Sequence, residues 1–246
     1  MKVIACSQAR YDSTRLLGKV LQTVNGQSLL QYHITRLKSA KNITEHVIAT
    51  SDHSNDDSVA VHCLEQGVRV FRGSKLNVLQ RFAGVVQMLG LDDDDRIIRL
   101  TADCPLVDGL LVDQLIAYHL ERGDDYSSLY IGEHVRGFDA EIMSVKALKM
   151  AAKNAVKDYQ KEHVTPYLYQ HPEQFKTSQY KVVCDYQDNA RLCIDEPTDL
   201  EMFEQLVGAY PTDICAAQYM DILNFLKHHP QIALLNHAVK QKKLGE

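Results

Sequence analysis

The chain has 246 residues, of which 45% are hydrophobic and 24% are charged, enough for one globular domain with a sizeable core. A disordered tail or a minimal binding peptide is therefore excluded. Its 27 Lys and Arg residues face 32 Asp and Glu residues, and the net charge of −5 supplies no chain-wide basic field for nucleic acid. Any phosphate binding must therefore be local.

The sequence carries no signal for export or for a membrane. The apolar run after Lys2 covers only residues 3–6, too short for a secretory signal, and no run of about 18 apolar residues follows it. The six cysteines contain no C-x-x-C pair, so neither a zinc ribbon nor a disulfide framework is predicted. We therefore expect a cytoplasmic protein with reduced thiols and no membrane insertion.

Short apolar segments alternate with amphipathic segments through the first half of the chain. The predicted strands are residues 3–6, 47–49, 68–71 and 97–100, and the predicted helices are residues 29–37, 59–64, 78–89 and 112–120. Alternation of this kind is typical of a mostly parallel sheet that is covered by helices on both faces. The pattern predicts an α/β, doubly wound architecture.

The second half of the chain is less regular. We expect strands at residues 141–143 and 182–184, and helices at residues 145–156, 200–207, 219–226 and 232–239. No linker or repeat divides the sequence. We therefore predict a single domain over residues 1–246, with a smaller insertion or dimerisation arm within residues 124–184.

The loop after the first predicted strand concentrates positive charge. Within twelve residues, Gln8–Lys19, it carries three cations and the aliphatic hydroxyl groups of Ser13 and Thr14. Arg10 and Arg15 could bind phosphate oxygens, Lys19 adds a point charge, and backbone amides near Ser13 could donate as well. The loop fits neither the dinucleotide-binding nor the P-loop pattern, which disfavours a dehydrogenase or a P-loop NTPase. An ordinary solvated basic loop remains the alternative interpretation.

Two carboxylates follow predicted strands further along the chain. Asp103 comes after the fourth predicted strand, and Asp195 precedes a predicted helix. Either could be structural, as a turn residue or as a helix N-cap. Because ligands of open α/β sheets bind at the carboxyl ends of strands, the pair beside a basic loop predicts metal-assisted phosphoryl or nucleotidyl transfer.

Three more polar positions are candidates for a second substrate. Asp139 and Glu141 stand at alternate positions, hence on one face if the backbone is extended, and could bind sugar hydroxyls. His163 could act as a general base, although a lone histidine is more often structural. The acidic run Asp92–Asp95 reads as a solvated turn, or as the metal site of a glycosyltransferase.

With these residues in view, the chain resembles the acylneuraminate and 3-deoxy-manno-octulosonate cytidylyltransferase family, and within it the branch named after spore-coat polysaccharide biosynthesis protein F. The matching segments are residues 8–21, 49–51, 71–74, 78–82, 99–106, 137–141, 162–166 and 191–200. The resemblance implies a Rossmann-like nucleotidyltransferase fold, CTP as the donor, Mg²⁺ as the cofactor, and a homodimer whose second subunit helps to cover the sugar site.

The resemblance also implies roles for individual residues. The triphosphate would lie on Arg10, Arg15 and Lys19, alongside Gln8, Ala9 and Ser13, and Mg²⁺ would be held by Asp103 and Asp195. By the same resemblance, the residues near the nucleoside would be Thr50, Ser51, Arg72 and Ser74. Those near the acceptor sugar or the dimer contact would be Asp139, Glu141 and His163. The catalytic group would be Asp103, Asp195 and Lys19.

The sequence departs from the family pattern at three places. Leu17 replaces a proline, Ala102 replaces a glycine, and Lys75-Leu76-Asn77 replaces an acidic stretch beside the expected base pocket. Together, the residues and the resemblance predict transfer of CMP from CTP to an acidic sugar, giving a CMP-sugar and pyrophosphate for surface polysaccharide or glycan synthesis. The alternatives are a glycosyltransferase that uses a nucleotide-sugar, and a non-catalytic nucleotide-binding module.

Overall fold

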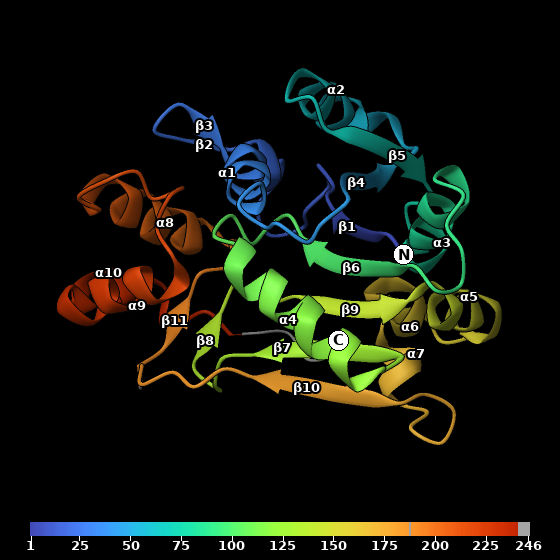
Figure 1. Cartoon of the computed structure of the whole chain (residues 1–246). Helices are drawn as coiled ribbons and strands as arrows, with labels where there is room; N and C mark the ends of the chain where they lie inside the picture. The colour runs from blue at the N-terminus through green and yellow to red at the C-terminus, as the bar shows by residue number, and fades with distance from the viewer. Residues whose placement is uncertain (187, 241–246) are drawn as a thin grey trace.

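A seven-stranded sheet forms the centre of the computed structural model, which describes residues 1–186 and 188–240 (Figure 1). The strand order is β10-β7-β9-β6-β1-β4-β5. The strands are β1 (Val3–Gln8), β4 (Glu45–Ser51), β5 (Arg69–Gly73), β6 (Arg96–Thr101), β7 (Tyr126–Tyr130), β9 (Glu141–Ser144) and β10 (Thr177–Lys181). Only β9 runs antiparallel to its neighbours in this sheet, so the predicted mostly parallel sheet is confirmed.

Helices cover both faces of the sheet. One face carries α3 (Val78–Met88), α5 (Val145–Asn154), α6 (Asp158–His163) and α7 (Pro166–Tyr169), and the other carries α1 (Leu29–Leu37), α2 (Asp57–Glu65) and α4 (Gly109–Arg122). Alternate residues of each strand face opposite sides: in β1, Ile4 and Cys6 pack with α3, whereas Val3 and Ala5 pack with α4. Burial on both faces explains the near-continuous apolar strands in the sequence.

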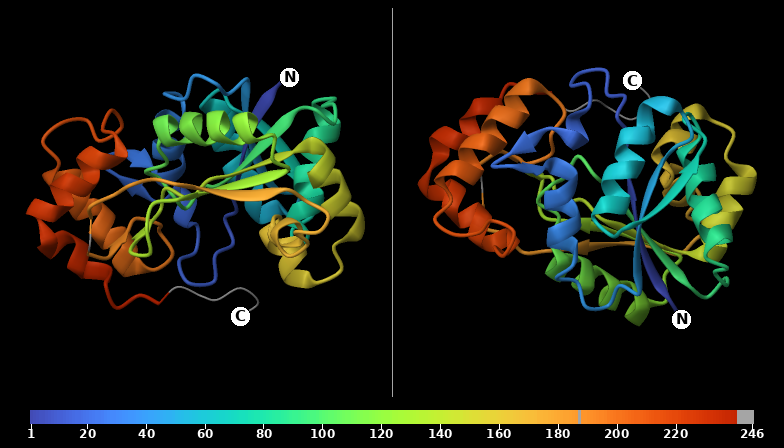
Figure 2. Two further views of the ribbon diagram at one scale, coloured as in Figure 1. Left: turned by 60° about the horizontal axis from the view of Figure 1, so that its bottom comes forward. Right: turned by 90° about the horizontal axis from the view of Figure 1, so that it is seen from above.

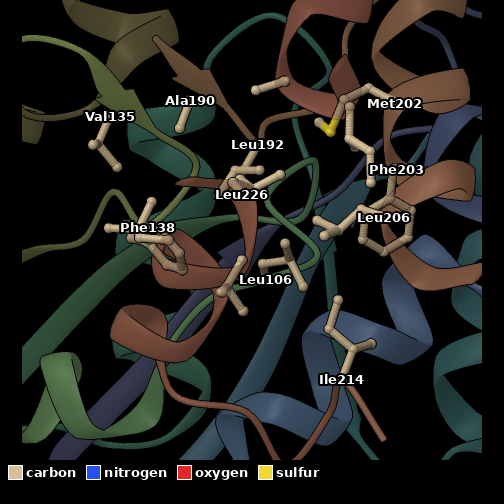
Figure 3. Packing of buried hydrophobic residues seen from close by; sticks show 14 of the residues in the cluster. Leu106, Val135, Phe138, Ala190, Leu192, Met202, Phe203, Leu206, Ile214 and Leu226 are labelled. Atoms are coloured by element: carbon tan, nitrogen blue, oxygen red, sulfur yellow. The ribbon is translucent and has the colours of Figure 1, made fainter. Parts of the chain in front are cut away.

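The C-terminal helices form a separate group at one end of the sheet (Figure 2). They are α8 (Pro197–Ala209), α9 (Tyr219–His228) and α10 (Pro230–Ala233), and they lie beside a two-stranded sheet of β8 (Val135–Arg136) and β11 (Ala190–Arg191). In Figure 3, Leu106 from the segment after β6 meets Leu192 after β11 and Leu226 of α9 in one buried cluster. This packing brings the segment after β6 next to the segment that precedes α8.

Five short elements complete the described fold. The basic loop ends in a 3₁₀ turn, η1 (Lys19–Leu21), and a small hairpin of β2 (Thr23–Val24) and β3 (Gln27–Ser28) leads into α1. A second 3₁₀ turn, η2 (Ser54–Asp56), precedes α2, and a third, η3 (Leu234–Asn236), follows α10. Across residues 1–186 and 188–240, no helix has the length and apolar character that spanning a membrane requires.

The sequence patterns were accurate in the first half and weaker in the second. The predicted strand at residues 182–184 is wrong: β10 ends at Lys181, and Val183 is 95% exposed. An edge strand with few apolar residues, Thr177–Lys181, gives little hydrophobic signal. The predicted helix at residues 232–239 is also wrong, because the chain forms only the short α10 and then η3.

Residues 124–184, where we expected an insertion or arm, supply β7, β9 and β10 of the central sheet together with α5, α6 and α7. The pairing of β9 with both β6 and β7 joins this segment to the parallel half of the sheet. Its role in dimerisation stays a prediction.

Candidate active site

The basic loop leaves β1 at the carboxyl edge of the sheet and is closed by a glycine. Gly18 has a φ of 65°, and its N–H donates to the Tyr11 carbonyl at 2.8 Å. A Cβ atom at Gly18 would lie 2.8 Å from a ring carbon of Tyr11, so this close approach requires a glycine. The turn directs the next residue, Lys19, toward the interior, and its side chain is only 11% exposed.

The Lys19 ammonium joins the two carboxylates that the sequence singled out. Its Nζ lies 2.7 Å from an oxygen of Asp103 and 2.7 Å from an oxygen of Asp195. Burial alone would lower the pKa of Lys19, but the two carboxylates outweigh it and hold the pKa above its usual range. Burial likewise opposes ionisation of Asp103, yet Lys19 keeps its pKa below the usual value. Asp103 therefore remains charged, and both carboxylates converge on one cation.

Backbone contacts fix Asp103 at the end of β6. The N–H of Ala102 donates to the Gln8 carbonyl at 3.0 Å, and the N–H of Ile194 donates to the carbonyl of Asp103 at 2.8 Å. The second of these bonds is the direct link between the two acidic segments. Because Ile194 immediately precedes Asp195, this bond brings the backbone of Asp103 close to that of Asp195, although the two are 92 positions apart in the sequence.

A buried network holds Asp195 from the other side. Arg191 donates to Asp195 at 2.8 Å and to Asp199 at 3.0 Å, while Asp199 accepts from the backbone N–H of Asp195 at 2.9 Å. Asn236, in the last 3₁₀ turn, donates to Asp199 at 2.8 Å and to the Arg191 carbonyl at 2.9 Å. The N-cap of α8 is Glu196, not Asp195, so the helix-cap interpretation of Asp195 is wrong.

Arg15 adds positive charge next to this centre. It pairs with Asp195 at 3.1 Å and with Glu196 at 3.1 Å. Asp195 thus contacts three cations, Lys19, Arg15 and Arg191. Together with Glu196 and Asp199, the network joins these three cations to four carboxylates, and Arg15, at 25% side-chain exposure, is the most accessible of the cations.

The rest of the loop extends toward β5. Arg10 donates to the Lys75 carbonyl at 3.2 Å, and the Lys75 ammonium pairs with Asp12. Ser13 accepts a long hydrogen bond, 3.5 Å, from the N–H of Leu16. These contacts bridge the loops that follow β1 and β5.

The strand ends supply the other predicted nucleotide residues. Ala9 is buried, and its N–H donates to the Ala49 carbonyl at 3.2 Å, which joins β1 to β4. At the end of β5, Arg72 donates to the Ser51 carbonyl at 3.0 Å, and Ser74 accepts from the N–H of Asn77 at 3.1 Å. These residues line the carboxyl ends of neighbouring strands.

Ser51 and Thr50 point to opposite faces of β4. Ser51 bonds through its hydroxyl group to Asp56 of η2 and lies on the α3 face, as Val47 and Ala49 do. Thr50 is fully buried on the α2 face with Ile48, and its hydroxyl oxygen has no partner among the described residues. A role for both at one nucleoside stays a prediction.

The three predicted acceptor residues have separate surroundings. Glu141 accepts from Tyr126 at 2.5 Å and from Thr165 at 2.7 Å, and it pairs with Arg99. Asp139 lies in the loop before β9, so the two carboxylates do not share a strand as expected. His163 ends α6, two residues before Thr165, and burial lowers its pKa.

A glycine brings the Asp139 loop to the centre. Gly137 has a φ of 110°, and a Cβ atom there would lie 2.6 Å from the backbone of Leu192. The loop that carries Asp139 therefore lies against the segment that leads to Asp195. The predicted acceptor side of the site is thus adjacent to the Lys19 centre, while contact of Asp139, Glu141 or His163 with a sugar stays a prediction.

Sequence reasoning missed Arg81, Arg191 and Asp199. Arg81 stands on an otherwise apolar face of α3 and is only 1% exposed. A cation at a core position of an amphipathic helix is the signal that could have identified it. Arg191 lies four residues before Asp195, and Asp199 lies four residues after it. This spacing acquires a meaning only once the structure shows that both residues bond to Asp195.

The structure separates Asp92–Asp95 from the centre. This acidic run precedes β6, at the end of the strand opposite to Asp103. Asp95 accepts from the N–H groups of Lys2 at 2.6 Å and of Asp92 at 2.9 Å, and Asp93 pairs with Lys149. These are the contacts of a structural turn, so the geometry disfavours the glycosyltransferase alternative.

Comparison with known proteins identifies the family. A family model described as cytidylyltransferase matches residues 4–235. The chain is 36% identical to the spore coat polysaccharide biosynthesis protein SpsF of Bacillus subtilis, with 88% of this chain and 92% of that protein covered. It is 35% identical to an uncharacterized protein of Methanocaldococcus jannaschii over 100% of this chain and 99% of that protein. An 8-amino-3,8-dideoxy-manno-octulosonate cytidylyltransferase of Shewanella woodyi is 30% identical over 63% of this chain and 62% of its own length.

Solved structures of similar proteins show the same fold. A cytidylyltransferase from Leptospira borgpetersenii superimposes with a TM-score of 0.88 at 29% identity, covering 98% of this chain and 100% of that one. A CMP:2-keto-3-deoxy-manno-octonic acid synthetase, solved with CTP, shares the fold with a TM-score of 0.66 at 16% identity, over 85% of this chain and 99% of that one. The nucleotidyltransferase fold expected from the resemblance is therefore confirmed. With residues 4–235 matched and the fold in agreement, the chain belongs to the cytidylyltransferase family.

Proposed function

We propose that this protein transfers CMP from CTP to a hydroxyl group of an acidic sugar and releases pyrophosphate. The observation that carries the proposal is the convergence of Asp103 and Asp195 on the Lys19 ammonium, at 2.7 Å each, beside Arg15. A site in which cations are paired with two carboxylates suits a substrate that brings both phosphate charge and a counter-ion, because phosphate can take over the cations and the counter-ion can take over the carboxylates.

The chain's own cations would bind the donor. Arg10 and Arg15 hold carbonyl or carboxylate oxygens at 3.1–3.2 Å, contacts that phosphate oxygens can replace. Lys19 would follow the phosphates and leave its position between the carboxylates. All three would then neutralise the pyrophosphate group as the bond between the α-phosphorus and the bridging oxygen breaks. The acceptor hydroxyl attacks the α-phosphorus from the opposite side, and its proton passes to water.

Asp103 and Asp195 are the residues that would hold Mg²⁺. The Lys19 ammonium already stands as a cation between their oxygens, and carboxylate oxygens are the ligands that Mg²⁺ prefers. When bound, the ion would supply charge stabilisation at the phosphate oxygens. Arg191 donates to the carboxylate of Asp195, and Asp199 accepts from the backbone N–H of Asp195. These bonds would orient Asp195 whether or not the ion is present.

The nature of the acceptor is supported by the relatives. One is named for spore coat polysaccharide biosynthesis, and others are named 8-amino-3,8-dideoxy-manno-octulosonate cytidylyltransferases. In this chain, the loop that carries Asp139 and the cluster around Glu141 would receive the sugar, with His163 at its border. The half-buried Arg99, bound to Glu141, offers a cation for an acidic sugar on that side.

Pyrophosphate release tests the proposed reaction. Each of the four nucleoside triphosphates is incubated with the purified protein, Mg²⁺ and a panel of sugar acids. We expect release only when CTP and a sugar acid are present together. A purine triphosphate that supports equal release, or CTP consumption that no acceptor accelerates, would reject the proposal.

A further inference from the structure

Arg81 is a buried cation without a hydrogen-bond partner among the described residues. Its side chain is among the largest that are fully buried, and in the described part of the chain its Nε, Nη1 and Nη2 atoms all lack a hydrogen-bond partner. Buried arginines are normally paired, because burying an unpaired charge is costly. A guanidinium group kept in this state is poised to bind a ligand that supplies acceptors.

The side chain lies at the carboxyl ends of three adjacent strands. A Cβ atom at Gly73, the last residue of β5, would lie 3.0 Å from the Arg81 Cγ. On β1, Ile4 and Cys6 face α3, and alternation places Gln8 on the same face, one step nearer the carboxyl edge. In Figure 1, α3 lies beside β5, whose carboxyl end leads into it.

Gln8 presents an unpaired acceptor on that same face. Its buried Oε1 has no hydrogen-bond partner among the described residues, so it is not bonded to Arg81 either. The neighbouring carboxylate, Asp56, is already engaged, since it accepts from the backbone N–H groups of Ser51 at 3.2 Å and of Tyr11 at 2.6 Å. Unpaired donors on Arg81 and an unpaired acceptor on Gln8 thus lie on the same face of the sheet.

The pattern of these groups selects among nucleobases. A guanidinium group offers two parallel N–H donors, and a glutamine oxygen offers one acceptor. The pairing edge of cytosine presents the complement, with acceptors at O2 and N3 and a donor at the N4 amine. Uracil carries a hydrogen at N3, which would face the guanidinium, and adenine and guanine present other patterns. We propose that Arg81 and Gln8 read the O2, N3 and N4 edge of cytosine and thereby set the donor preference.

This inference rests on the proposed function and names the residues that decide its donor. It also gives the loops over this edge a role. Arg10 donates to the Lys75 carbonyl, and Lys75 pairs with Asp12, so the loops after β1 and β5 are joined. Phosphate that binds Arg10 would break the first of these contacts.

Nucleotide affinity measured by titration calorimetry tests the inference. The dissociation constants of CTP and UTP are determined, each with Mg²⁺, for the wild type, Arg81→Met and Gln8→Met. We expect the wild type to bind CTP about tenfold or more tightly than UTP, as one mismatched buried donor would cause. Arg81→Met should weaken CTP binding about tenfold and bring the ratio close to one, and Gln8→Met should reduce the ratio in part.

Arg69→Met is the matched control, since Arg69 begins the same β5 strand at its other end, is 54% exposed, and pairs with Glu45. Its CTP to UTP ratio should equal that of the wild type. If Arg81→Met weakens both nucleotides equally, or lowers only the melting temperature, the inference is overturned. If Arg81→Met does not fold, an unchanged ratio in Gln8→Met overturns it and a reduced ratio supports it. A wild type that prefers UTP or a purine would instead reject the proposed function itself.

Discussion

His33 on α1 donates a hydrogen bond of 2.9 Å from its Nδ1 atom to the backbone carbonyl of Cys104, the residue that follows Asp103. Its Nε2 must therefore accept from the Ser7 hydroxyl at 2.7 Å, and His46 must donate its Nε2 hydrogen to the same Ser7 oxygen at 2.9 Å. A chain of neutral side chains thus runs beneath the sheet edge and supports the acidic turn.

The first prediction is that stability falls in mild acid. Burial lowers the pKa of His33 to about 4, whereas an unfolded histidine titrates near 6.5. The unfolded state therefore binds more protons below pH 6.5, so stability is complete above that pH and is lost as the pH falls toward 4. The loss is up to about 1.4 kcal/mol per pH unit for this group. Melting temperatures between pH 7.5 and 5 measure it.

His33→Gln should lower the melting temperature at pH 7 but flatten its dependence on pH. The control is His228→Gln, because His228 lies exposed on α9 and bonds only to the carbonyl of Asn224. Curves for His33→Gln and the wild type that run parallel from pH 7.5 to 5 would contradict the assignment.

The second prediction concerns the two carboxylates. Asp103→Asn and Asp195→Asn should each lower turnover by about a hundredfold or more, because removing one well-placed charge costs on the order of 3 kcal/mol in the transition state. The double variant should lose far less than the product of both effects, since the two act through one ion. Asp93→Asn, which removes a surface partner of Lys149, should remain fully active. Full activity in Asp103→Asn would refute the mechanism.

A third prediction separates metal binding from catalysis. Lys19→Met leaves two charged carboxylates facing each other without their shared cation, so the melting temperature should fall by about 3 °C or more. Mg²⁺ without nucleotide should then raise the melting temperature of Lys19→Met clearly more than that of the wild type, because the ion replaces the ammonium.

Lys149→Met is the control for that experiment, as its ammonium also lies 2.7 Å from a carboxylate but on the surface. It should respond to Mg²⁺ as the wild type does. Equal responses of Lys19→Met and the wild type would argue against a metal position between Asp103 and Asp195.

The fourth prediction is a homodimer in solution. The segment 124–184 contains β10, which pairs with β7 on one side only, and the fully exposed Val183 follows it. Light scattering should give a mass of twice 27.9 kDa at micromolar concentration. A monomeric mass would mean that one chain completes the acceptor site alone.

Asp103 was recognisable from the sequence because it closely follows a predicted strand, and Lys19 because it lies in the basic loop that leaves the first predicted strand; strand ends of a parallel sheet share one edge. Local patterning also predicted the strands and helices of the first half, where buried strands are continuously apolar and helices carry clear stripes. These features depend on residues near one another in the chain, which is why they can be read without a structure.

Only the tertiary structure decided what the distant residues do. The network that orients Asp195 includes Asn236, which lies 41 positions later in the chain. Asp195 does not cap α8, because the N-cap of that helix is Glu196. The unpaired state of Arg81 is likewise a property of everything packed around it, since a carboxylate within hydrogen-bond reach would have made it an ordinary buried ion pair. A sequence specifies which groups are charged, but whether a charge is paired depends on contacts between segments that are far apart in the chain.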